Sequence, residues 1–105
     1  PEAERRGLDV FVRAGCPSCH APPAMTNLGR HPTASVFPSA RAPSGASLDT
    51  PSLRGVSRRT RFLFDGRAPT LAAIFLQRGD DDRHGRTGEL ADHELADLLR
   101  FLESL

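Results

Sequence analysis

The sequence predicts one all-α domain in which three to five short helices are joined by long loops. Residues 91–104 carry apolar side chains at helical spacing, and residues 5–15 show the same pattern over a shorter stretch. No segment alternates apolar and polar residues as a half-buried strand does. A chain of 105 residues has room for one modest core, so we expect residues 1–105 to form a single domain.

Between these two helices the chain is mostly loop. One more helix is expected over residues 70–78, with Thr70 or Pro69 placed to begin it and Gly79 as a natural stop. Residues 53–64 indicate a turn followed by a brief helix. Residues 21–52 are rich in Pro, Ala and Ser, and a loop of that length in a compact domain usually wraps something functional.

Charge and hydropathy narrow the range of partners. The formal net charge is +1, which gives no indication of a nucleic-acid partner, and no stretch approaches the roughly 20 apolar residues that span a bilayer. Without an initiator Met or a signal peptide, the chain is expected to be processed or cut from something larger. We interpret two charge clusters as exposed surface, a basic one (Arg54, Arg58, Arg59 and Arg61) and an acidic one (Asp80, Asp81 and Asp82).

One motif carries specific chemistry. The run CPSCH is C-x-x-C-H, the attachment signature of haem c, and it consists of Cys16, Cys19 and His20. On one helical turn these positions share a face. Both thiols can then form thioethers with one porphyrin while the imidazole reaches the iron from the same side. The motif therefore predicts one covalently bound haem c with His20 as an iron ligand.

Other uses of two cysteines fit less well. A thioredoxin-like redox pair needs a βαβ context, and the sequence offers no strands. A structural zinc site needs four ligands, whereas this chain has no second cysteine pair, and His20 directly beside Cys19 has poor geometry for zinc. A chance match to the motif is the remaining alternative.

The segments around the motif extend the comparison to known families. Gly7, Phe11 and CPSCH resemble the start of class I cytochromes c, in which a glycine and an aromatic residue on the first helix cross the last helix, here near Leu98 and Phe101. SLDTPSLRGVSRRTRFLFDGRAPTL and LADHELADLLRFLESL resemble the haem domains of the bacterial di-haem cytochrome c peroxidase superfamily. The resemblance covers about residues 7–105 and implies a class I cytochrome c-like fold around one haem.

The resemblance also implies roles for individual residues. The carbonyl of Pro51 would accept the Nδ1 proton of His20, and Arg54 and Arg67 are candidates to bind haem propionates. Many relatives have a histidine where this chain has Phe64, and a phenylalanine cannot ligate iron or transfer a proton. Only one C-x-x-C-H is present, so the second haem of the peroxidases is absent from this chain.

The second axial ligand of the iron is open at this point. Met25 follows the motif too closely to cross easily to the far face of a porphyrin, and His93 is expected to be exposed on the last helix. Small class I cytochromes take this ligand from the segment before the last helix, where His84 lies. We favour His84, which gives bis-histidine ligation, with His31, Met25 or an open site as alternatives.

The expected function is electron transfer by a single haem c, with no catalytic residues. The alternatives are a peroxidase-like haem enzyme domain and a haem-based sensor, both of which need an open or displaceable site on the iron. The expected partner is a redox protein or a fused redox domain, and the basic cluster would help to dock an acidic one. Because haem is attached to such motifs outside the bacterial cytoplasm, we expect a periplasmic or otherwise exported protein.

Overall fold

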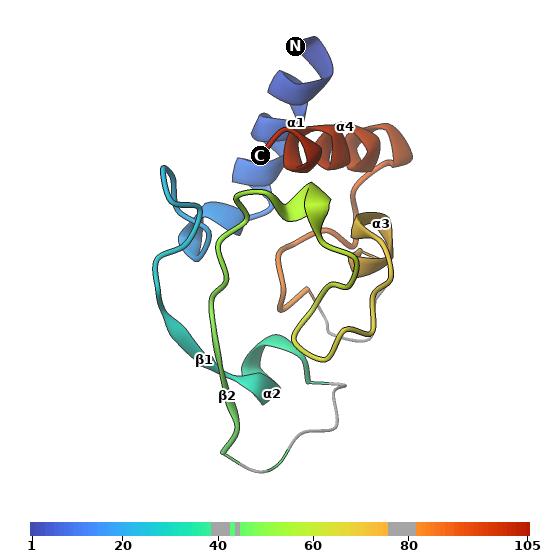
Figure 1. Cartoon of the computed structure of the whole chain (residues 1–105). Coiled ribbons are helices and arrows are strands. Elements are labelled where there is room, and N and C mark those ends of the chain that lie inside the picture. Colours follow the sequence, from blue (N-terminus) through green and yellow to red (C-terminus); the bar gives the residue numbers. More distant parts are fainter. Residues whose placement is uncertain (39–42, 44, 76–81) are drawn as a thin grey trace.

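Helices α1 (Glu2–Arg13) and α4 (Asp92–Glu103) cross at one end of the molecule (Figure 1) in this computed structural model, which describes residues 1–38, 43, 45–75 and 82–105. Phe11 and Leu98 are almost fully buried between them. The ring of Phe11 lies 5.1 Å from that of Phe101, within the range of a favourable aromatic pair. The crossing therefore buries the apolar stripes that the sequence places on both helices.

The two helices meet at a glycine. A Cβ atom added to Gly7 would lie 2.0 Å from the backbone oxygen of Asp97, so only a residue without a side chain permits this separation. Two ion pairs flank the contact: Arg6 with Asp97 at 2.8 Å and Arg13 with Glu94 at 2.6 Å. The hydrogen bond from Arg6 lowers the pKa of Asp97, and the backbone N–H of Ala91 together with Arg13 lowers the pKa of Glu94. Shape and charge thus fix how α1 and α4 cross.

The prediction of an all-α fold is wrong. Strands β1 (Arg30–Pro32) and β2 (Ser47–Asp49) form an antiparallel two-stranded sheet, with Arg30 opposite Asp49 and His31 opposite Leu48. The strands are three residues long, too short to show an alternating pattern. Their pairing depends on cross-strand contacts, among them the Arg30–Asp49 ion pair at 2.6 Å. The fold is a mixed one, with a small sheet remote from the α1–α4 crossing (Figure 1).

The remaining elements are short. Helix α2 (Thr33–Val36) follows β1, and the 3₁₀ turn η2 (Val56–Arg58) lies within the predicted 53–64 segment. Helix α3 (Leu71–Ile74) is shorter than the predicted 70–78 helix and ends at Ile74, with Phe75 as its C-cap. The Oγ1 atom of Thr70 accepts the backbone N–H of Ala73 at 3.1 Å, so Thr70 is the N-cap of α3 as expected. The proposed stop at Gly79 lies outside the described residues, as do Asp80 and Asp81.

The core continues below α1 and α4 into the loops. Its members are Val10, Phe11, Met25, Val56, Phe62, Ala68, Leu98 and Leu102. They come from α1, α4, η2 and the loop segments around residues 25 and 62–68, so this core joins loops to the helix pair. Within the described residues, no helix has the length and apolar character needed to cross a membrane.

Replacing Gly7 with alanine is expected to destabilise the protein by about 2 kcal/mol or more, because the new methyl group meets backbone that cannot rotate away. Thermal unfolding should show a melting temperature lower by roughly 8 °C or more. Val12→Ala, on the same helix at a position 56% exposed, is the control and should change stability by less than about 0.5 kcal/mol. Equal stability of Gly7→Ala and the parent chain would contradict the close crossing.

Candidate haem site

The motif cysteines begin where α1 ends. Gly15 has φ +85°, a left-handed conformation that ends the helix and turns the chain into the 3₁₀ turn η1 (Cys16–Ser18). The backbone N–H groups of Cys19 and His20 donate to the carbonyl of Cys16 at 3.3 and 2.9 Å. Cys16, Cys19 and His20 therefore lie on one tight turn, in the arrangement that the motif predicts.

Both cysteines are free thiols and half-buried. Burial raises the pKa of the Cys16 thiol to about 11, so Cys16 is protonated at neutral pH. The sulfur of Cys19 lies 3.5 Å from Nε2 of His31, which comes from β1. This contact places His31 beside the turn of residues 16–20 that carries the motif (the attachment turn), on the side of Cys19.

His20 is held by its Nδ1 atom, which lies 3.1 Å from the carbonyl oxygen of Pro51. A carbonyl can only accept, so Nδ1 carries the hydrogen and Nε2 keeps its lone pair. Burial lowers the pKa of the imidazole, which favours the neutral form that binds metals. The contact expected between Pro51 and His20 is thus present, and it leaves Nε2 available as a ligand.

The imidazole of His84 faces that of His20. The ring centres are 6.4 Å apart, and the planes are inclined by 73°. With metal–nitrogen bonds of about 2 Å and roughly 1.1 Å from each nitrogen to its ring centre, two imidazoles on opposite sides of one metal atom have centres roughly 6.2 Å apart. The distance between the ring centres is therefore close to the value for two imidazoles that bind one metal atom.

The loop that carries His84 is fixed to the end of α1. The backbone N–H of Arg86 donates to the carbonyl of Ala14 at 2.9 Å, and Nη2 of Arg86 donates to the carbonyl of Arg13 at 3.1 Å. These carbonyls belong to the last turn of the helix, where they have no partner within it. Arg86 thus serves as a C-terminal cap of α1 and places His84 over the attachment turn.

Two of the other ligand candidates, Met25 and His93, lie away from His20, whereas His31 lies beside Cys19. Met25 is 3% exposed and packs in the apolar core, and its backbone carbonyl accepts the N–H of Leu53. His93 is exposed in the first turn of α4. Of the candidates considered from the sequence, His84 alone has a ring contact with His20 within the described residues.

The two arginine candidates have different surroundings. Arg54 is exposed, and its Nε donates to the carbonyl of Pro23 at 2.8 Å, which ties it to the turn after His20. Arg67 is half-buried, with its guanidinium carbon 5.2 Å from the centre of the Phe37 ring. Arg67 therefore lies against the ring of Phe37. Propionate binding by either arginine stays a prediction.

Sequence reasoning missed Phe37 and Arg86. Phe37 contacts three groups of the site: His84 at 5.1 Å, Phe64 at 5.3 Å and Arg67. Its only sequence signal is that it is one of few large apolar residues in a long loop. Neither residue belongs to a motif, and their roles depend on contacts between distant segments.

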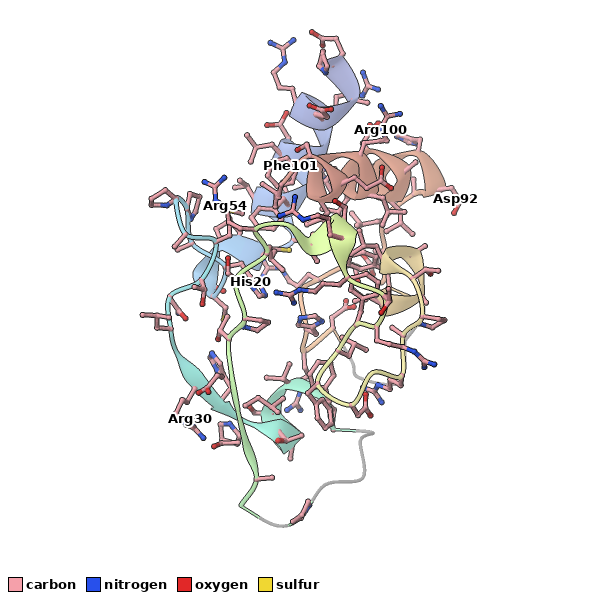
Figure 2. The ribbon with its side chains drawn as sticks, in the orientation of Figure 1. His20, Arg30, Arg54, Asp92, Arg100 and Phe101 are labelled. Atoms are coloured by element: carbon pink, nitrogen blue, oxygen red, sulfur yellow. The ribbon has the colours of Figure 1, made fainter. Side chains whose placement is uncertain are left out.

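The donor set restricts the kind of metal centre. Among the described residues, no group of three or more His, Cys, Asp or Glu side chains could hold a metal ion. A zinc site built from protein ligands is therefore absent from this part of the chain. Two facing imidazoles suit a metal whose other ligands come from a macrocycle. In Figure 2, the labelled side chain of His20 lies just below helices α1 and α4.

Replacing Arg86 with alanine is expected to loosen the His84 loop, because one hydrogen bond to α1 and the packing of the guanidinium against Gly15 are lost. A hydrogen bond contributes about 1 kcal/mol, so amide hydrogen exchange of residues 82–90 should become roughly fivefold faster. Arg83→Ala removes an exposed arginine from the same loop and should leave exchange unchanged. Unchanged exchange in Arg86→Ala would argue against the cap.

Comparison with known proteins gives two likenesses, while no family model matches the chain. Hydrazine synthase subunit gamma of Kuenenia stuttgartiensis is 41% identical over 59 residues, which are 55% of this chain and 17% of that protein. The structure of Kuenenia stuttgartiensis hydrazine synthase pressurised with 20 bar xenon contains a chain that superposes with a TM-score of 0.81 and 25% identity. The match covers 100% of this chain and 46% of that one. The chain thus shares its fold with somewhat less than half of a hydrazine synthase chain.

Proposed function

We propose that this chain binds one haem c through thioether bonds to Cys16 and Cys19, with His20 and His84 as axial ligands, and that it transfers single electrons. The observation that carries the proposal is the opposition of the two imidazoles, 6.4 Å apart, above an intact C-x-x-C-H turn. Bound there, haem supplies a one-electron iron couple.

The residues of the site have distinct roles in this proposal. The turn of η1 presents both thiols and the imidazole of His20 from one short segment. Pro51 fixes the tautomer of His20 and raises the basicity of its Nε2 atom through the contact at Nδ1. The cap formed by Arg86 holds His84 on the opposite side. Two imidazole ligands lower the reduction potential relative to a histidine–methionine pair.

Electron transfer is favoured over an enzymatic role at the iron. Imidazoles on both sides leave no position for peroxide or a gas. Phe64, where similar peroxidase domains often have a histidine, is 41% exposed and packs on Phe37, and its side chain cannot transfer a proton. The peroxidase-like and sensor alternatives both need His84 to leave the metal.

We also propose a setting for the domain. The sequence resemblance to the di-haem peroxidase superfamily and the likeness to part of hydrazine synthase subunit gamma both support a haem module within a larger redox assembly. That relative is named as one subunit of hydrazine synthase, which is consistent with a domain that works beside other protein chains. Covalent haem attachment would place the chain outside the bacterial cytoplasm.

The basic cluster of Arg54, Arg58, Arg59 and Arg61 is the proposed docking surface for an acidic redox partner. All four are exposed, and none forms an ion pair with a carboxylate in the described part of the chain. Arg54, Arg59 and Arg61 instead donate to backbone carbonyls, which holds them in place. Arg59 donates to Ser52, the residue after Pro51, so the surface lies close in the chain to the contact with His20.

Replacing His84 with alanine is expected to open one side of the iron. The low-spin spectrum of the parent protein should become high-spin, and carbon monoxide should bind the reduced protein rapidly at neutral pH. His31→Ala removes an imidazole near Cys19 and is expected to keep the low-spin spectrum. An unchanged low-spin spectrum in His84→Ala would refute His84 as ligand, and loss of haem on denaturation would refute covalent attachment.

The docking surface can be tested with an acidic probe, a fluorescent oligoglutamate peptide, by fluorescence anisotropy. The double change Arg58→Gln and Arg61→Gln should weaken binding roughly two- to thirtyfold at low salt, since exposed charge pairs contribute about 0.2–1 kcal/mol each. The control is Arg5→Gln with Arg100→Gln, two exposed arginines on α1 and α4 that give the same net charge. Equal weakening by both pairs would show an effect of net charge alone.

A further inference from the structure

His84 lies on an irregular stretch of the chain. It is exposed, and it lies between Asp82 at φ +57° and Gly85 at φ +80°, and residues 82–91 form no helix or strand. The cap at Arg86 fixes the backbone two residues further on. Contacts of the side chain itself also contribute to the orientation of the imidazole.

Phe37 supplies such a contact. The centres of the Phe37 and His84 rings are 5.1 Å apart, and their planes are inclined by 50°, which is within the range of a favourable aromatic pair. Phe37 is 5% exposed. The ring of His84 thus has two neighbours, the ring of His20 at 6.4 Å and the buried ring of Phe37 at 5.1 Å.

Phe37 is itself fixed from several directions. Its backbone N–H donates to the carbonyl of Thr33 at 2.8 Å at the end of α2, and Thr33 is 2% exposed. The guanidinium carbon of Arg67 lies 5.2 Å from the centre of the ring, a cation–π distance. The ring of Phe64 packs against it at 5.3 Å. Phe37 is therefore a rigid support for a side chain on an irregular loop.

We infer that Phe37 is a positioning residue for His84: its ring holds the imidazole over His20 and so determines how readily another ligand displaces it. The inference rests on the proposed function, because it takes His84 as an axial ligand. It assigns a role to the end of α2, which the motif and the α1–α4 crossing leave unexplained.

The inference predicts a specific effect on ligand exchange. An external ligand binds only the fraction of molecules in which His84 has left the metal, so its apparent dissociation constant equals the intrinsic constant divided by that fraction. Removing the aromatic contact releases the imidazole more often. An aromatic pair corresponds to roughly two- to twelvefold in an equilibrium constant, so the apparent affinity for carbon monoxide should rise by that factor.

The test compares Phe37→Leu, Phe37→Tyr and Phe62→Leu in the haem-loaded protein by carbon monoxide titration of the reduced form and by thermal unfolding. Phe37→Leu keeps an apolar side chain but loses the ring, and should bind carbon monoxide roughly two- to twelvefold more tightly. Phe37→Tyr keeps the ring and should match the parent affinity. Phe62 is a core phenylalanine 7% exposed, so Phe62→Leu should lower stability without changing the affinity.

The possible outcomes separate this inference from the proposed function. If His84→Ala opens the iron while Phe37→Leu binds carbon monoxide as the parent does, Phe37 does not position His84 and the ligand assignment stands. If His84→Ala leaves coordination unchanged, the ligand assignment itself fails. If Phe37→Leu and Phe62→Leu both bind carbon monoxide more tightly by the same factor, the effect comes from a general loss of stability. That result would overturn the inference. If Phe37→Leu does not fold, Phe37→Tyr provides the test, because it keeps the ring. A higher affinity of Phe37→Tyr for carbon monoxide than that of the parent protein would contradict the inference.

Discussion

The last turn of α1 is the feature on which the candidate site depends. Downstream, the chain continues through Gly15 into the turn that carries Cys16, Cys19 and His20. From the opposite side, Arg86 donates to the carbonyls of Arg13 and Ala14 and so brings His84 to the same place. One helix end therefore positions both histidines, and the crossing of α1 with α4 at Gly7 fixes that end within the core.

The two halves of the site are built differently. On the side of His20, a backbone carbonyl fixes the ring through a strong, directional contact, and burial keeps the imidazole neutral. On the side of His84, the ring is exposed and is supported by packing on Phe37. The two rings therefore differ in how they are held, that of His20 by a hydrogen bond and burial and that of His84 in part by an aromatic neighbour.

The sequence predicts those parts of the structure that are set by local pattern. C-x-x-C-H predicts the attachment turn, and the spacing of Leu95, Leu98 and Leu102 predicts α4, because both signals lie within a few residues of one another. The sheet was missed because strands of three residues have no readable period and pair through cross-strand contacts. Phe37 was missed for a related reason, since its role exists only once α2 and the His84 loop meet.

If the motif alone determined function, every chain with C-x-x-C-H would be equivalent. The contacts around His84 lie outside the motif and differ from it in kind. Cys16, Cys19 and His20 define what can be bound, and they occupy a turn whose geometry depends on few other residues. What the bound group can do depends on the opposite face, where a loop, an aromatic ring and a capping arginine act together. Those elements lie in segments with weak sequence signals. In the haem-bound state proposed above, loss of His84 from the metal would open the site to ligands without any change in the motif, so the activity would depend on the packing around that loop.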